Sequence, residues 1–598
     1  MRDEHARMLA FLQTLLTRYL ALGDQSAAAG IDPDTAARRL AELYLTEAAF
    51  RYTALDAPTQ VVVLGPTQTG KSTIVNLLLG RRLAEVSPLA GFTVHPQGFW
   101  TLDGKPPADW LAALFPGRER REVDQLDRDP QHLDQYALTR PDWNGPRPDL
   151  PSCVLWDTPD FDSLAARGYQ RGVCETAALA DVHVFVLSKE KYADLSVWKM
   201  LRLLQPLGRP LVVCLNKMTS DAREPITAAL RQRLGEIGYD LVQTPIVDID
   251  YDSTLLNDTN IASRPERSAL RGALISALSR IPKDKAVGVA RLIRRRQDDW
   301  LAPIRAEQAA LAEWEQLVNT TLNETAQAYK RDFLDHPQRF DTFRRATVEL
   351  LHLLELPGVA NVISKVRLTL SWPARQLFAA RQAWSLKRLR RGGMTHGLGS
   401  EEVVLFEAIE KLLTSLARDA SRRCEQSESG EPVWRLIARC LEQQAPALRQ
   451  DFEAAARQQR ADFAPVIHAT ANKLFDVLRN KPTLLNTLRA ARVTTDLAAI
   501  ALAVKTAGLG MNDLLFAPAM FALTSMLTEG ALGTYMIRAS DELKRKQFEH
   551  MKSRFIDAVC AKQLVDLVSD LKDETLFGVS AEQLRDAEQA LQAWEAAR

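Results

Sequence analysis

Residues 61–73 read VVVLGPTQTGKST, and this stretch decides the fold of the first half of the chain. The four apolar residues at 61–64 favour a buried strand, and the run TIVNLLLG that begins at Thr73 favours a helix. Between them lies the pattern G-x-x-x-x-G-K-[ST] over Gly65–Ser72. A strand, a glycine-rich loop and a helix in this order predict an α/β domain in which the loop joins the sheet to its first helix.

The loop contains the residue types that bind phosphate groups. Gly65 and Gly70 let the backbone wrap around an anion so that its N–H groups point inward, and the helix adds the positive end of its dipole. Lys71 is placed to contact the β- and γ-phosphates, and the Ser72 hydroxyl to bind Mg²⁺. We therefore predict a site for a purine nucleoside triphosphate with Mg²⁺. The alternative is an ordinary glycine-rich turn ahead of a helix.

Further apolar runs predict the rest of the sheet. CVLW at 153–156, VHVFVL at 182–187 and LVVCL at 211–215 are continuous enough for strands that are covered on both faces. We expect a mostly parallel sheet with helices on both faces. The stretch 103–151 is rich in Pro, Asp and Arg without a clear period, which favours a surface insertion.

The second half is predicted to be helical. Strand signals nearly vanish after about residue 285, and apolar residues then recur at spacings of three, four and seven. In the first long helix they are Ile304, Leu311, Trp314, Val318, Leu322, Tyr329 and Phe333. We predict an extended helical stalk or bundle. The expected segments are N-terminal helices (1–57), the nucleotide domain (58–285), a stalk (286–496), an apolar helical hairpin (497–537) and C-terminal helices that return to the bundle (538–598).

Composition narrows the class of protein. The 76 Lys and Arg residues against 75 Asp and Glu give a net charge of +1, which argues against a protein that coats nucleic acid. Six scattered cysteines without a C-x-x-C pair fit reduced thiols, and the N-terminal sequence has no signal-peptide pattern. We therefore expect a cytoplasmic protein without a structural zinc site, and no specific nucleic-acid partner is indicated.

Three elements of the first half resemble the translation-factor-related class of P-loop GTPases. LWDTPDFDS at 155–163 resembles the D-x-x-G element of that class, and LNKM at 215–218 is similar to the N-K-x-D element that reads guanine. EKYAD and VW within 190–198 resemble the segment that follows D-x-x-G in a group of bacterial GTPases. The elements occur in the family's order across roughly residues 58–285. The resemblance implies a GTPase with GTP and Mg²⁺ as its ligands.

Two positions depart from the family pattern. Asp160 stands where the family has the glycine whose N–H senses the γ-phosphate, so the sensing is in question. Thr219 stands where the family has the aspartate that accepts two hydrogen bonds from guanine, so we expect weaker discrimination against ATP. Asp157 follows a predicted strand, where a carboxylate can hold Mg²⁺ directly or through water; an ordinary acidic turn is the alternative.

The resemblance also implies the remaining site residues. Thr93, 22 residues after Lys71, resembles the threonine that closes over Mg²⁺ and the γ-phosphate in dynamin-like members, although a simple turn threonine would look the same. Thr67 and Gln68 are the nearest matches to the side chains that position water in dynamin-like proteins. The predicted catalytic residues are Lys71, Thr93, Gln68 and Thr67. The predicted metal ligands are Ser72, Thr93 and Asp157. The predicted nucleotide ligands are Gly65, Thr69, Gly70, Lys71, Ser72, Thr73, Asp160, Asn216, Lys217 and Thr219.

Helices on both sides of a nucleotide domain resemble the dynamin-like plan, in which they pack as a neck and carry a membrane-binding tip. The segment 497–537 is either a shallow membrane-inserting hairpin or a pair of core helices. The basic cluster at 387–391 fits anionic lipid, RNA or a solvated helix end.

We therefore expect a dynamin-like GTPase that couples nucleotide state to conformational change or self-assembly. Its expected partners are GTP and GDP, an anionic surface at the inner face of the membrane, and a second copy of the chain through the helical region. The alternatives are a switch GTPase that acts on a ribosome or another assembly, and a nucleotide-binding scaffold with little hydrolysis.

Overall fold

The computed structural model describes residues 2–25, 32–86, 93–127, 132–142, 150–162, 166–250, 261–337, 339–353, 400–426, 431–480, 533–569 and 578–596. The chain divides into two compact units, Met1–Arg305 with Asp573–Arg598, and Ala306–Lys572. Of the predicted apolar hairpin at 497–537 only 533–537 is described, and the basic cluster at 387–391 lies outside the described residues. None of the described helices is long and apolar enough to span a membrane.

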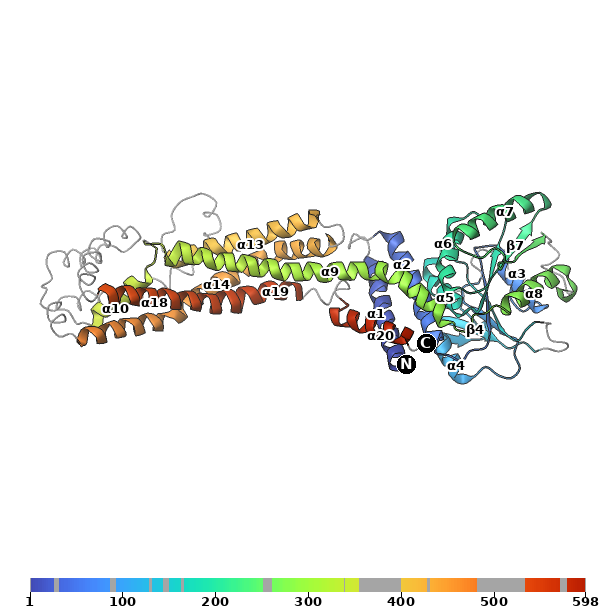
Figure 1. The fold of residues 1–598 in the computed structure, drawn as a ribbon, viewed down its shortest axis with the longest axis horizontal. Helices are drawn as coiled ribbons and strands as arrows, with labels where there is room; N and C mark the ends of the chain where they lie inside the picture. Colours follow the sequence, from blue (N-terminus) through green and yellow to red (C-terminus); the bar gives the residue numbers. More distant parts are fainter. Residues whose placement is uncertain are drawn as a thin grey trace. The chain divides into compact units, whose positions relative to one another are not determined.

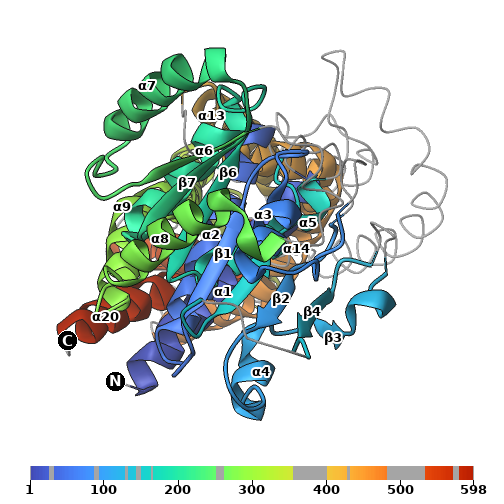
Figure 2. The same ribbon diagram turned by 90° about the vertical axis from the view of Figure 1, so that its right-hand side faces the viewer.

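An eight-stranded, mostly parallel sheet forms the centre of the first unit, as the sequence predicts (Figures 1 and 2). Its strand order is β3-β4-β2-β5-β1-β6-β7-β8. The strands are β1 (Gln60–Leu64), β2 (Gln97–Trp100), β3 (Glu119–Arg121), β4 (Gln135–Thr139), β5 (Val154–Asp157), β6 (Val182–Leu187), β7 (Leu211–Met218) and β8 (Ile246–Asp250). Strand β2 runs antiparallel to β5, and the other neighbouring pairs are parallel.

The four strands predicted from apolar runs are confirmed as β1, β5, β6 and β7, and they form the middle of the sheet. Every residue of β1 is buried, which explains why residues 61–64 are continuously apolar rather than alternating. The other four strands were not predicted from the sequence. Two of them, β3 and β4, come from the stretch 103–151 and extend one edge of the sheet.

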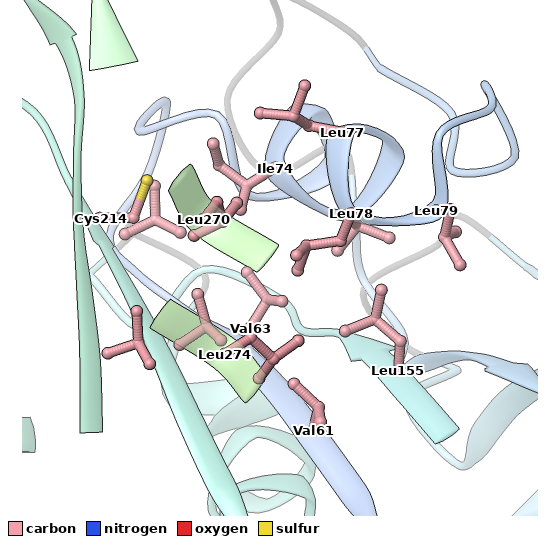
Figure 3. Close-up of a cluster of buried hydrophobic side chains, with 14 of the residues drawn as sticks. Val61, Val63, Ile74, Leu77, Leu78, Leu79, Leu155, Cys214, Leu270 and Leu274 are labelled. Carbon is pink, nitrogen blue, oxygen red and sulfur yellow. The ribbon is translucent and has the colours of Figure 1, made fainter. Parts of the chain in front are cut away.

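Helices cover both faces of the sheet. On one face α3 (Lys71–Leu79) and α8 (Pro265–Leu278) pack against β1, β5 and β7, and Figure 3 shows their interlocked aliphatic side chains. On the other face α5 (Ala166–Leu179) lies against β1 and is itself covered by α2 (Pro33–Tyr52). The remaining elements of this domain are α4 (Ala108–Leu114), η1 (Val123–Gln125), α6 (Leu195–Leu204), η2 (Gln205–Leu207), α7 (Ser220–Glu236) and η4 (Ile261–Ser263).

Helices from both ends of the chain pack together in the first unit. Helix α1 (Arg2–Gln25) contacts α2 and α20 (Ala581–Ala596), and Phe50 of α2 lies 4.7 Å from Trp594 of α20 between ring centroids. The beginning of α9 (Ala286–Tyr329) completes this group. Its Trp300 accepts a 2.7 Å hydrogen bond from the Tyr19 hydroxyl at the backbone oxygen and donates one of 3.0 Å from the indole to Glu42.

The start of α2 illustrates how a helix terminus is set locally. Asp32 caps the helix, because its carboxylate accepts a 3.0 Å hydrogen bond from the backbone N–H of Thr35. Pro33 follows as the first helical residue, a position that suits its fixed φ angle and its missing N–H.

The second unit is entirely helical in its described part. It contains the rest of α9, η5 (Lys330–Leu334), α10 (Thr342–Leu353), α13 (Ser400–Gln426), α14 (Glu431–Arg479), α18 (Gly533–Met551), η7 (Lys552–Ala561) and α19 (Lys562–Ser569). The seam predicted along α9 is buried, except that Leu311 is half-buried. The Glu401 carboxylate accepts hydrogen bonds from Tyr329, Gln459 and Gln547 at 2.9, 3.3 and 3.0 Å. The predicted segment boundaries themselves stay predictions.

Candidate nucleotide-binding site

The loop Gly65–Ser72 leaves the carboxyl end of β1 in the middle of the sheet and leads directly into α3. Gly70 caps this helix with a φ of +87°, in the left-handed region that glycine favours. A Cβ atom at Gly70 would collide with the Asn216 side chain, and one at Gly65 would collide with the Val186 carbonyl of β6. Both glycines are therefore required by the close approach of neighbouring strands to the loop.

Lys71 lies back across this loop rather than extending into solvent. Its ammonium donates a 3.2 Å hydrogen bond to the Pro66 carbonyl, and only 5% of the residue is exposed. The Thr69 hydroxyl also donates to the Pro66 carbonyl, at 2.8 Å, which helps to hold the loop closed. The charge of Lys71 is thus held over the concave side of the loop, where the sequence predicts phosphate groups.

Two predicted magnesium ligands lie side by side. The Ser72 hydroxyl donates a 2.6 Å hydrogen bond to Oδ2 of Asp157, the last residue of β5. The other carboxylate oxygen of Asp157 is buried and has no hydrogen-bond partner among the described residues. Burial raises the pKa of Asp157 to about 6, although the Ser72 hydrogen bond and the Lys71 charge lower it. A buried carboxylate with a free oxygen beside a hydroxyl fits the oxygen ligands that Mg²⁺ requires.

Thr93 is not brought to these ligands by any described contact. It is half-buried, and it forms no hydrogen bond with another described residue. It directly follows residues 87–92, which are not described. Its predicted role therefore stays a prediction. Thr73 lies in the first turn of α3, next to Ser72, and its predicted role as a nucleotide ligand stays a prediction.

The segment after β5 contacts the loop through two further aspartates. Asp160 forms a buried ion pair with the Lys71 ammonium. Asp162 accepts hydrogen bonds from the backbone N–H and hydroxyl of Thr67, at 2.5 and 2.7 Å, and from Lys191 at 2.8 Å. Burial alone would raise the pKa of Asp162, but the hydrogen bonds from Lys191 and Thr67 outweigh it and hold the pKa below its usual value. The sequence motifs did not identify Asp162 or Lys191 as residues of the site.

The predicted guanine-reading residues Asn216 and Lys217 lie near the end of β7 and contact the loop from there. Asn216 donates a 2.8 Å hydrogen bond from its amide to the Thr69 carbonyl, and Lys217 donates one of 2.7 Å to the Gln68 carbonyl. The ladder between β7 and β8 shifts register between Leu215 and Met218, and such irregularities re-aim side chains. Lys217 and Gln68 both have a positive φ, of +58° and +60°.

A cavity of about 410 Å³ opens between these residues and the loop, within the size range of small-molecule sites. It is lined by Thr67, Gln68, Ser188, Lys189, Glu190, Lys191, Lys217 and Thr219. Thr67 and Gln68 of the loop and the predicted base-reading residues Lys217 and Thr219 thus line one cavity. The nearby Thr219 hydroxyl lowers the pKa of the exposed Asp221 carboxylate.

The comparisons with known proteins agree with this geometry. Residues 60–217 match the family described as "50S ribosome-binding GTPase". This part of the chain is therefore a P-loop GTPase domain, as the sequence resemblance implies. No curated protein sequence matches the chain.

Two solved structures are similar to parts of the fold. A GDP·AlF4⁻ complex of an Era variant from Aquifex aeolicus is 18% identical, with a TM-score of 0.23. The similarity covers 38% of this chain and 58% of that one, so this chain spans less than two thirds of the Era structure's length. An oligomerised bacterial dynamin pair, described as a mechanism for the long-range sensing and tethering of membranes, is 10% identical with a TM-score of 0.26. That similarity covers 96% of this chain and 83% of that one.

Proposed function

We propose that this protein is a GTP-binding and GTP-hydrolysing dynamin-like protein, which couples its nucleotide state to conformational change and self-assembly at an anionic membrane surface. The observation that carries the proposal is the packing of helices from both chain ends on the helix that directly follows the GTPase domain. Tyr19 of α1 and Glu42 of α2 are both hydrogen-bonded to Trp300 of α9, and Arg305 of α9 pairs with Glu588 of α20 at 3.1 Å.

This packing gives the GTPase domain a direct mechanical connection to the helices. Helix α2 contacts both α1 and α5, and α5 lies against the central strand β1. On the same group of helices, Arg294 of α9 pairs with Glu595 of α20. A movement of the nucleotide domain therefore reaches the start of α9 through packed side chains.

The chemistry expected of the site is phosphoryl transfer to water. Lys71 and the loop N–H groups would neutralise charge on the β- and γ-phosphates, and Ser72 and Asp157 would hold a Mg²⁺ ion, which would offset further negative charge there. The left-handed conformation of Gln68 exposes the tip of the loop to the cavity, where its side chain and Thr67 are the candidates for orienting water. Guanine is expected in the cavity next to Lys217 and Thr219.

Nucleotide-dependent assembly tests the proposal. We expect GTP or its β,γ-imido analogue to increase the mass of the protein in light scattering and to increase its co-sedimentation with liposomes that contain anionic lipid. Neither effect should occur with GDP. Lys71→Ala should remove both effects, and the matched control Lys199→Ala, on the exposed surface of α6, should retain them. A wild-type protein that hydrolyses GTP but neither assembles nor binds liposomes would refute the dynamin-like function.

A switch GTPase that acts on the ribosome is the second candidate, and the description of the matching family favours it. This candidate predicts co-sedimentation with the large ribosomal subunit in the presence of the β,γ-imido analogue and release with GDP. The same preparation tested with liposomes separates the two functions, because the dynamin-like function predicts binding to the liposomes alone.

A further inference from the structure

The segment D-T-P-D-F-D at 157–162 presents three carboxylates to the phosphate-binding loop. Asp157 accepts a hydrogen bond from Ser72, Asp160 pairs with Lys71, and Asp162 accepts two hydrogen bonds from Thr67. Only the first contact belongs to the predicted magnesium site. The other two join negative charges to groups that the loop uses for phosphate.

The partners of Asp160 and Asp162 are groups whose position and chemistry suit them to donate hydrogen bonds to phosphate. Lys71 is the lysine expected to bind the β- and γ-phosphates, and the Thr67 N–H is one of the backbone donors that line the loop. A carboxylate oxygen on these donors imitates a phosphate oxygen, because both are anionic acceptors. The side chains of Lys71 and Asp160 are 5% and 10% exposed, so this pair is largely removed from water.

We propose that Asp160 and Asp162 form an intramolecular latch. In the nucleotide-free protein the two carboxylates occupy Lys71 and Thr67, which would otherwise donate hydrogen bonds to phosphate, and they must be displaced when a nucleoside triphosphate binds. The latch rests on the proposed nucleotide site. The Asp160 side chain leaves Lys71, and the backbone N–H of the same residue becomes available to the γ-phosphate. The glycine of the D-x-x-G pattern has no side chain that could form such a contact.

Lys191 connects the latch to the cavity. It holds Asp162 at 2.8 Å and Asp194 at 3.1 Å, and it lines the cavity in which the base is expected. When Asp162 leaves Thr67, Lys191 retains Asp194 as a partner. A nucleotide that enters the cavity therefore meets both Thr67, which Asp162 occupies, and the lysine that positions the latch.

The latch has a consequence for affinity that differs from that of an ordinary structural ion pair. Removal of the Asp160 charge leaves the Lys71 ammonium buried without its anion in the free protein, which is unfavourable. In the complex the phosphates supply the anion, so the complex loses little. Asp160→Asn should therefore bind nucleotide at least ~10-fold more tightly than the wild type, which corresponds to about 1.4 kcal/mol.

The test is a titration with GDP and with the β,γ-imido analogue of GTP in the presence of Mg²⁺, with stopped-flow association in parallel. The variants are Asp160→Asn and Asp162→Asn, and the matched control is Asp250→Asn, which removes an exposed carboxylate charge of the same domain, paired with Arg223, without touching the loop. We expect tighter binding by both variants and unchanged binding by the control. The wild-type association rate should level off at high nucleotide concentration, because displacement of the latch becomes limiting.

The outcomes separate the latch from the function on which it rests. If the wild type binds nucleotide and folded Asp160→Asn and Asp162→Asn bind no more tightly, the latch is wrong and the nucleotide site stands. A wild-type association rate that rises linearly to saturation of the signal also overturns the latch, and this measurement needs no variant. If neither the wild type nor the variants bind any nucleotide, both proposals fail. Binding by the variants alone would support the latch most strongly.

Discussion

Replacement of Thr219 by aspartate should convert a weak preference for GTP into a strong one. Thr219 lines the cavity together with Lys217, and it precedes the first residue of α7. A threonine hydroxyl cannot accept the two hydrogen bonds that guanine offers from N1 and N2, whereas one carboxylate accepts both.

The magnitude follows from the hydrogen bonds that are gained. A hydrogen bond to a charged acceptor contributes about 1.5–3 kcal/mol. Repulsion from the nearby Asp221 opposes the gain, although that carboxylate is fully exposed and therefore well screened. The capping position favours the change, because Thr219 forms no capping hydrogen bond with α7 and aspartate is a preferred N-cap residue. If the repulsion offsets about one of the two bonds, the net gain is that of one bond, so we expect GTP affinity to rise ~10- to 100-fold with ATP affinity unchanged or lower.

The assay is a competition titration of both nucleotides against a fluorescent GDP analogue. Thr219→Asn is the matched control, since it has the shape of aspartate without the charge and should gain much less. Equal gains for GTP and ATP in Thr219→Asp would show that the base does not lie against this residue. A wild type that prefers ATP would refute the guanine assignment itself.

Three further predictions concern stability and membrane binding. Glu401→Ala should destabilise the helical unit by about 3–5 kcal/mol, because three buried donors lose their acceptor; calorimetry should show a smaller loss for the more exposed Glu402→Ala. Burial lowers the pKa of His183 to about 4, whereas the pKa is about 6.5 in the unfolded chain. Between pH 6.5 and 4 the unfolded state therefore binds more protons at this residue than the folded state does. About 3 kcal/mol of stability should be lost across that range, and urea titrations of His183→Gln should show a correspondingly flatter pH dependence. The sequence places Phe516 and Phe521 in the apolar segment 497–537. Replacement of both by aspartate should abolish liposome co-sedimentation while GTP hydrolysis continues. If this variant unfolds and the wild type never co-sediments, the segment belongs to the hydrophobic core instead.

The central strands could be predicted from the sequence because they are buried on both faces and therefore consist of runs of apolar residues. Strand β1 reads QVVVL and is buried throughout. Strand β8 reads IVDID and lies at the edge of the sheet, so it alternates and gives a much weaker signal. Strand β2 contains Gly98, which lies so close to Leu138 and Trp156 that a Cβ atom would collide with both. Such a contact is tertiary, and no local pattern predicts it.

The candidate site divides in the same way. The loop Gly65–Ser72 could be predicted because strand, loop and helix are contiguous in the sequence. Asp162 could not, since its role depends on a contact with Thr67, which lies 95 residues earlier in the chain. Asp160 was recognised as a departure from the family pattern, but its pairing with Lys71 requires the fold. The sequence offers only one signal for both contacts, the three aspartates within the six residues DTPDFD.

Turnover of GTP by the purified protein tests the central assignment most directly. We expect Mg²⁺-dependent release of phosphate from GTP by the wild type. Lys71→Ala should abolish nucleotide binding or turnover, because the substitution removes the charge that neutralises the β- and γ-phosphates. Circular dichroism should show that the variant retains its fold, and Lys199→Ala should retain full activity. Turnover by a folded Lys71→Ala protein at the wild-type rate would contradict the assignment of the site.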